Sequence, residues 1–178
     1  MSELLEIENL SVRFPLRKSG GAFGAKTYLT AVDSVNFTVK KGETLAIVGE
    51  SGSGKSTAAR IALGAELPDP GGQVMFTPDP GGETLNVHAM DRTQRTMLQR
   101  RAQMVFQDPY SSLSPRMRIL DALTEPLDIH NIGTKAERRE RAEEMLRQVS
   151  LGPDMLKRFP HAFSGGQRQR LSIARALT

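Results

Sequence analysis

Apolar and polar side chains alternate in the first forty residues of the chain, as they do in strands with one buried face. Residues 4–14, LLEIENLSVRF, and residues 34–40, SVNFTVK, change character at nearly every second position and predict such strands. The pair Lys41-Gly42 predicts a turn, after which the run TLAIV at 44–48 is apolar almost throughout. A short continuous apolar run is typical of a strand that is buried on both faces of a parallel sheet.

Helical periodicity begins after the glycine-rich loop at 49–54. The segment KSTAARIALGAEL, 55–67, is predicted to be a helix that ends before Pro68. Further on, QVMFT at 73–77 and AQMVF at 102–106 are predicted strands, and the predicted helices cover 91–101, 116–129, 134–150 and 165–178. The stretch from Ser111 to His161 is interpreted as a helical insert within an α/β chain.

The composition fits a soluble globular domain and narrows the classes of function. The chain has 178 residues, of which 38% are hydrophobic and 25% charged, which is ordinary for one domain with a real core. Its net charge of +4 is scattered among acids, so nucleic acid is not an expected partner. The absence of cysteine excludes disulfides and thiolate sites within these residues. We expect no secretory signal in MSELLEIENL, and any membrane role to pass through a partner.

The strongest chemical signal is the segment GESGSGKST, which we call the phosphate loop. It satisfies the pattern G-x-x-x-x-G-K-[ST] between a predicted buried strand and a predicted helix. Glycines allow successive backbone N–H groups to face phosphate oxygens, and the helix that follows adds its positive N-terminal dipole. Lys55 is predicted to pair with the β- and γ-phosphates, and the Ser56 hydroxyl to ligate Mg²⁺. The predicted nucleotide-binding residues here are Gly49, Glu50, Ser51, Gly52, Ser53, Gly54, Lys55, Ser56 and Thr57.

Two weaker elements follow. In VFQDP, 105–109, Gln107 comes directly after a predicted strand, where its amide could reach a metal or a water; by itself it is more often a surface residue. In SGGQ, 164–167, a serine and two glycines open a helix, which makes either an anion-binding N-terminus or an ordinary helix start.

The order and spacing of these elements resemble the nucleotide-binding subunit of ATP-binding cassette (ABC) transporters along the whole chain. VGESGSGKST, FQDPYSSLSPR and FPHAFSGGQRQRLSIARAL look most like the ATPases of bacterial oligopeptide, dipeptide and glutathione importers. The resemblance implies an α/β fold with a P-loop NTPase core of the ABC type, an N-terminal antiparallel β subdomain and a helical insert. The corresponding divisions of the chain would be 1–110 for the β subdomain and P-loop core, 111–162 for the helical subdomain, and 163–178 for the signature motif and its helix.

The resemblance also assigns roles to residues. Phe14 takes the position of the aromatic residue that stacks on adenine, and Tyr28 is the second candidate. Gln107 would sense Mg²⁺ and the γ-phosphate. The candidate catalytic residues are therefore Gln107 and Lys55, and the candidate metal ligands are Ser56 and Gln107. The signature would contact the ATP held by a second subunit through Ser164, Gly165, Gly166 and Gln167, with Phe163 in place of the usual leucine.

The resemblance implies ATP and Mg²⁺ as cofactors and a dimer that sandwiches two nucleotides. Its partners would be a second ABC ATPase subunit, integral membrane permease subunits and, indirectly, a periplasmic or extracellular substrate-binding protein, with the ATPase on the cytoplasmic face of the membrane. Two alternatives remain: a non-transport ABC ATPase that acts on nucleic acid or the ribosome, and a nucleotide-binding module that does not hydrolyse. The stretch SSLSPR favours the importer over the first of these.

In this family the signature helix leads into a strand that ends in Asp-Glu, with a switch histidine later. We expect these groups to lie beyond Thr178, the C-terminal part of the sheet to be missing, and residues 1–178 alone not to turn over ATP. The three histidines have no metal-ligand spacing, and Arg168, Arg170 and Arg175 are interpreted as surface or interface charges.

Overall fold

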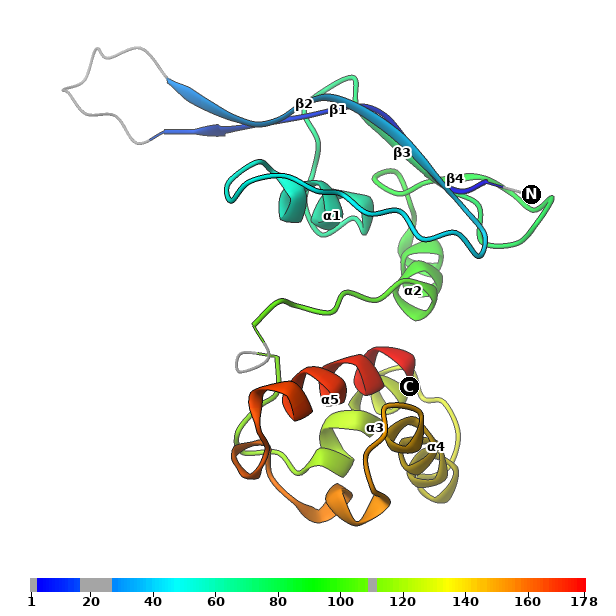
Figure 1. Ribbon diagram of the computed structural model, residues 1–178. Coiled ribbons are helices and arrows are strands. Elements are labelled where there is room, and N and C mark those ends of the chain that lie inside the picture. Colours follow the sequence, from blue (N-terminus) through cyan, green and yellow to red (C-terminus); the bar gives the residue numbers. More distant parts are fainter. Residues whose placement is uncertain (1–2, 17–26, 109–111) are drawn as a thin grey trace, which may run out of the picture. The chain divides into compact units, whose positions relative to one another are not determined.

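The computed structural model describes residues 3–16, 27–108 and 112–178 of the chain (Figure 1). These residues form two compact units, Met1–Gln103 and Met104–Thr178. Each unit has its own hydrophobic core, and no residue belongs to both cores. The finer boundaries expected at 110/111 and 162/163 stay a prediction.

The first unit is built on a four-stranded antiparallel sheet with the order β2-β1-β3-β4. The strands are β1 (Glu3–Pro15), β2 (Tyr28–Lys40), β3 (Gln73–Phe76) and β4 (Leu85–Asn86). The strands predicted at 4–14, 34–40 and 73–77 are confirmed, although β2 begins six residues earlier than its alternation indicated. The two residues of β4 were not predicted, because so short a segment carries no periodicity.

Helix α1 (Lys55–Ala62) packs on one face of this sheet, and α2 (Arg92–Arg101) adds to the same core (Figure 1). The core contains Ile7 of β1, Val74 of β3 and Ile61 of α1, which are all fully buried. Helix α1 ends five residues before the predicted end at 67, because Gly64 takes the left-handed φ of 68° that terminates a helix.

Two predicted strands are wrong. Residues 44–48 and 102–106 have no strand hydrogen bonding, and no strand in the described parts of the chain pairs with them. The apolar run at 44–48 is exposed, and 91% of the surface of Val48 is accessible to solvent. A strand needs a neighbour for its backbone N–H and C=O groups, so an apolar pattern alone does not make one.

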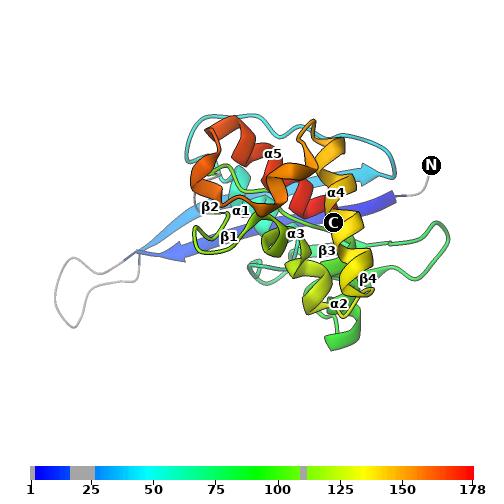
Figure 2. The same cartoon turned by 90° about the horizontal axis from the view of Figure 1, so that it is seen from below.

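The second unit is helical, and its elements are seen from below in Figure 2. It contains α3 (Ile119–Ile129), α4 (Lys135–Gln148), α5 (Gly165–Leu177) and two short 3₁₀ helices at Pro153–Lys157 and Pro160–Ala162. The predicted helices at 116–129, 134–150 and 165–178 are therefore confirmed with small shifts of their ends. The three α-helices and the 3₁₀ helix at Pro153–Lys157 share one core, which includes Leu123, Leu146, Leu156 and Leu171.

Helix α4 begins with a capping box, in which each of two residues caps the other. The Thr134 hydroxyl accepts from the N–H of Glu137, and a Glu137 carboxylate oxygen accepts from the N–H of Thr134 at 2.6 Å. These bonds favour the charged carboxylate and hold the pKa of Glu137 below its usual value.

Candidate functional site

The phosphate loop runs directly into α1 and lies against β2. Gly54 is the N-cap of α1 with φ 86°, a left-handed conformation that L side chains rarely adopt. A Cβ atom at Gly54 would lie 2.1 Å from the carbonyl oxygen of Ala31. Only glycine therefore allows the loop to turn into the helix at this distance from the strand.

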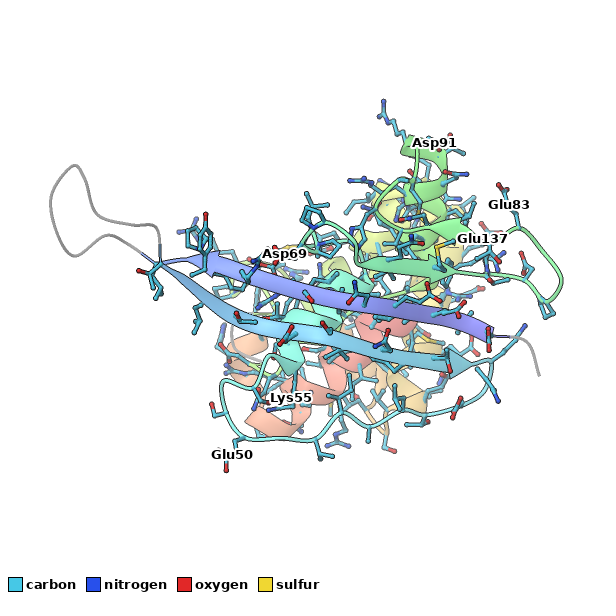
Figure 3. The ribbon with its side chains drawn as sticks, turned by 90° about the horizontal axis from the view of Figure 1, so that it is seen from above. Glu50, Lys55, Asp69, Glu83, Asp91 and Glu137 are labelled. Carbon is cyan, nitrogen blue, oxygen red and sulfur yellow. The ribbon has the colours of Figure 1, made fainter. Side chains whose placement is uncertain are left out.

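The Lys55 side chain folds back over the loop that precedes it. Its ammonium donates to the carbonyl oxygens of Gly49 at 2.8 Å and Glu50 at 2.6 Å, and to the Ser53 hydroxyl at 3.2 Å. Figure 3 shows the Glu50 side chain directed away from the loop. The loop therefore carries a full positive charge, while its acidic side chain points elsewhere.

The N-terminus of α1 favours an anion. Its first turn has no acidic residue, so nothing offsets the partial positive charge of its N–H groups. Ser56 is exposed in this turn beside Lys55, whereas Thr57 is buried. Mg²⁺ in nucleotide sites commonly keeps few protein ligands and takes the rest from phosphates and water. The exposed Ser56 hydroxyl fits that donor set.

The signature turn, Ser164–Gln167, is the start of α5 and forms a capping box of the kind that opens α4. The Ser164 hydroxyl accepts from the N–H of Gln167 at 3.3 Å, and the Gln167 side-chain oxygen accepts from the N–H of Ser164 at 3.0 Å. Phe163, just before the turn, is 5% exposed in the core of the second unit. The turn is thus anchored and its polar side chains are already ordered.

Gly166 has a surrounding unlike that of Gly54. A Cβ atom added there would meet nothing within 4 Å. Glycine in the first turn makes a helix less stable than alanine would. No neighbouring atom in the described residues excludes a larger side chain at position 166. The position that a side chain would take at Gly166 is therefore open space.

The other predicted site residues are less defined. Gln107 is exposed in a bend, and Pro109 of the VFQDP segment lies outside the described residues. Phe14 is half-buried and packs against the core of the first unit, whereas Tyr28 is 50% exposed. The phosphate loop and both aromatic residues belong to the first unit, and Gln107 and the signature turn belong to the second.

Sequence reasoning missed a polar contact between α5 and the segment after Gln107. Arg175, interpreted from sequence as a surface or interface charge, donates to the carbonyl oxygen of Ser112 and to the carboxylate of Glu125. The hydroxyls of Ser112 and Ser172 also bond to each other. Only the spacing of Ser172 and Arg175, three residues apart on one helix face, gave any signal.

Comparison with known proteins settles the family. The sequence pattern of the family described as ABC transporter matches residues 32–178, which is most of the chain. The chain belongs to the ABC transporter family. Membership confirms the resemblance drawn from the phosphate loop, Gln107 and the signature turn.

Several relatives within the ABC transporter family carry peptide-transport names. The chain is 46% identical to the oligopeptide transport ATP-binding protein AppF of Bacillus subtilis, over 98% of this chain and 51% of that protein. It is 45% identical to the di/tripeptide transport ATP-binding protein DppF of Pseudomonas aeruginosa, over 89% of this chain and 47% of that protein. The chain thus spans about half the length of these relatives.

Solved structures confirm an ABC-type α/β fold. A dimeric, post-hydrolysis structure of the ATP-binding cassette MJ0796 bound to ADP and Pi matches with a TM-score of 0.77 and 30% identity, over 98% of this chain and 69% of that one. Within the described ranges, none of the helices has the length and apolar character needed to span a bilayer.

Proposed function

We propose that this chain is the nucleotide-binding part of an ATP-binding subunit that energises peptide uptake by an ABC importer. The observation that carries the proposal is the phosphate loop, in which Lys55 lies over the loop at the acid-free N-terminus of α1. The peptide-transport names of AppF and DppF support the importer class and the peptide substrate.

Binding of ATP would use the backbone and the cation of the loop. The N–H groups at the start of α1 would donate to phosphate oxygens, and the Lys55 ammonium would exchange its loop oxygens for the β- and γ-phosphates. Mg²⁺ would be held in part by the Ser56 hydroxyl and would neutralise phosphate charge. Phe14 or Tyr28 would stack on adenine, and Tyr28 is the more exposed of the two.

A second subunit would complete the site with its signature turn. The Ser164 hydroxyl accepts one hydrogen bond in its capping box, which leaves its own proton to donate to a phosphate oxygen. The N–H groups of Gly165 and Gly166 open α5 and would face the same anion. Gln107 would report the state of the γ-phosphate to the permease, and the subunit would act on the cytoplasmic face of the membrane.

Complementation of uptake tests the proposal. We define the complete subunit as this chain together with any residues encoded beyond Thr178. In cells that lack it, a labelled peptide should enter only when the complete subunit is restored, and the Lys55→Ala variant should fail to restore entry. Normal uptake with Lys55→Ala, or uptake that never depends on the subunit, would contradict the proposed function.

A further inference from the structure

The C-terminal ends of α1 and α2, together with residues of β1, β2 and β3, line a cavity in the first unit. Its volume is about 390 Å³, which is within the range of small-molecule sites. Most of the lining is apolar, and Ala62, Phe76 and Leu98 are buried parts of its wall. Alanine at positions 62 and 102 leaves volume that a larger side chain would fill. We call this space the α1–α2 cavity.

Two exposed cations, Lys41 and Arg101, also line the α1–α2 cavity, and none of its described lining residues is acidic. Nη1 of Arg101 donates to the carboxylate of Asp79 at 2.8 Å and to the Pro78 carbonyl oxygen at 3.2 Å, which fixes the guanidinium. The hydrogen bond from Arg101, followed by the charges of Arg101 and Lys41, lowers the pKa of Asp79, so both cations lie near this carboxylate. The apolar cavity therefore has positive charge at one part of its lining.

We propose that the α1–α2 cavity binds a small amphipathic carboxylate, such as a medium-chain fatty acid. An apolar cavity offers water few hydrogen-bond partners, so an alkyl tail gains free energy by entering it. The carboxylate would stay beside the exposed cations and pair with Lys41 and Arg101. The inference does not rest on the proposed function, because no residue of the phosphate loop lines this cavity.

Other classes of ligand match the lining less well. Inorganic phosphate has no apolar part, so it would leave the buried wall unfilled. A neutral lipid would leave Lys41 and Arg101 without an anion. A short peptide carries an ammonium and amide groups as well as a carboxylate, and the apolar wall would leave those groups without hydrogen-bond partners.

Calorimetric titration of the complete subunit with decanoate, below the concentration at which it forms micelles, tests the charge at the opening. Decanoate should saturate one site, and 1-decanol, which has the same tail without the charge, should bind about tenfold more weakly. Lys41→Glu should weaken decanoate binding by about tenfold, because a repulsion between exposed charges replaces an attraction, and should leave decanol binding unchanged. The matched control is Lys40→Glu, at an exposed neighbour that does not line the cavity.

A second variant tests the site of the tail. In Ala102→Leu, the larger side chain would occupy part of the cavity, so the affinities for decanoate and decanol should both fall at least about tenfold. Ala65→Leu, at an exposed position outside the lining, is the matched control. Thermal unfolding of each variant reports whether it is folded, and the comparison of decanoate with decanol on the unaltered subunit needs no variant.

Three outcomes would overturn the inference. Failure of decanoate to saturate a site would mean that another part of the complete subunit fills the cavity. Equal affinity for decanoate and decanol would exclude a carboxylate as the recognised group. Unchanged decanoate binding in Lys41→Glu or in folded Ala102→Leu would place the ligand elsewhere. By contrast, a subunit that bound decanoate as expected but no ATP would support this inference and overturn the proposed function.

Discussion

Lys55 is the residue on which nucleotide binding should depend most. Its ammonium is the full positive charge held over the phosphate loop, and a charge-assisted contact to phosphate contributes about 1.5–3 kcal/mol. Lys55→Ala should therefore weaken Mg-ATP binding by at least about tenfold in calorimetric titration of the complete subunit. Lys41→Ala, in the exposed turn after β2, is the matched control and should bind normally. Equal affinity in the two variants would mean that the phosphate site lies elsewhere.

A single methyl group at position 166 should affect stability and ATP turnover in opposite directions. Because a Cβ atom there has no neighbour within 4 Å, Gly166→Ala should keep or raise stability, by up to about 1 kcal/mol. In the proposed site, the same methyl would occupy the space through which a phosphate would approach α5, so ATP turnover by the complete subunit should fall at least about tenfold. Thermal unfolding and turnover, measured on one preparation, test both halves. Undiminished turnover would remove Gly166 from the proposed site.

At the scale of elements, His88 makes the packing beside α1 sensitive to pH. Its Nε2 is the one buried side-chain nitrogen or oxygen in the described residues without a hydrogen-bond partner, and its ring bonds the backbone of Ile61. Burial, reinforced by the charge of Arg95, lowers the pKa of His88 below its ordinary 6.5. The unfolded chain therefore takes up a proton near pH 6.5 that the folded chain resists.

The stability of the first unit should consequently be highest above pH 6.5 and fall as the pH drops through the lowered pKa. Urea unfolding at pH 7.5 and pH 5.5, followed by a probe in the first unit, measures this loss. The His88→Gln variant should show a smaller loss over the same interval. An identical pH dependence in the variant would assign it to other groups.

Elements with a local signature could be predicted from sequence, and those that depend on distant partners could not. The alternation in 4–14 is a property of the strand itself, and β1 forms there. The run at 44–48 shows which residues avoid water, but a strand is defined by its neighbours, and residues 44–48 have no partner strand in the described parts of the chain. The same holds for the site: the phosphate loop is contiguous, whereas Arg175 and Ser112 are 63 residues apart and meet only after folding.

At the scale of the whole molecule, two separate cores predict two separable responses to damage. Leu146 is fully buried in the core of the second unit, so Leu146→Ala should destabilise that unit by about 2–5 kcal/mol. The phosphate loop belongs to the first unit and its core shares no residue with the second. Nucleotide affinity should therefore change less than about twofold while proteolysis within 112–178 accelerates. A parallel loss of affinity would show that the two units unfold as one.

In the proposed site, the hydrogen bonds of Lys55 would make nucleotide binding a competition between phosphate oxygens and loop carbonyl oxygens. The carbonyl oxygens of Gly49 and Glu50 already hold the ammonium at 2.8 and 2.6 Å, so an arriving phosphate must displace them. The affinity for the ligand would then be the difference between the contacts of Lys55 with phosphate and its contacts with the loop carbonyl oxygens. Only a strongly charged anion would displace those carbonyl oxygens. Adenosine, which has no phosphate, would gain no affinity from contact with Lys55, and each added phosphate would raise the affinity. The proposed loop would thus select for the phosphate end of a nucleotide, whatever its base.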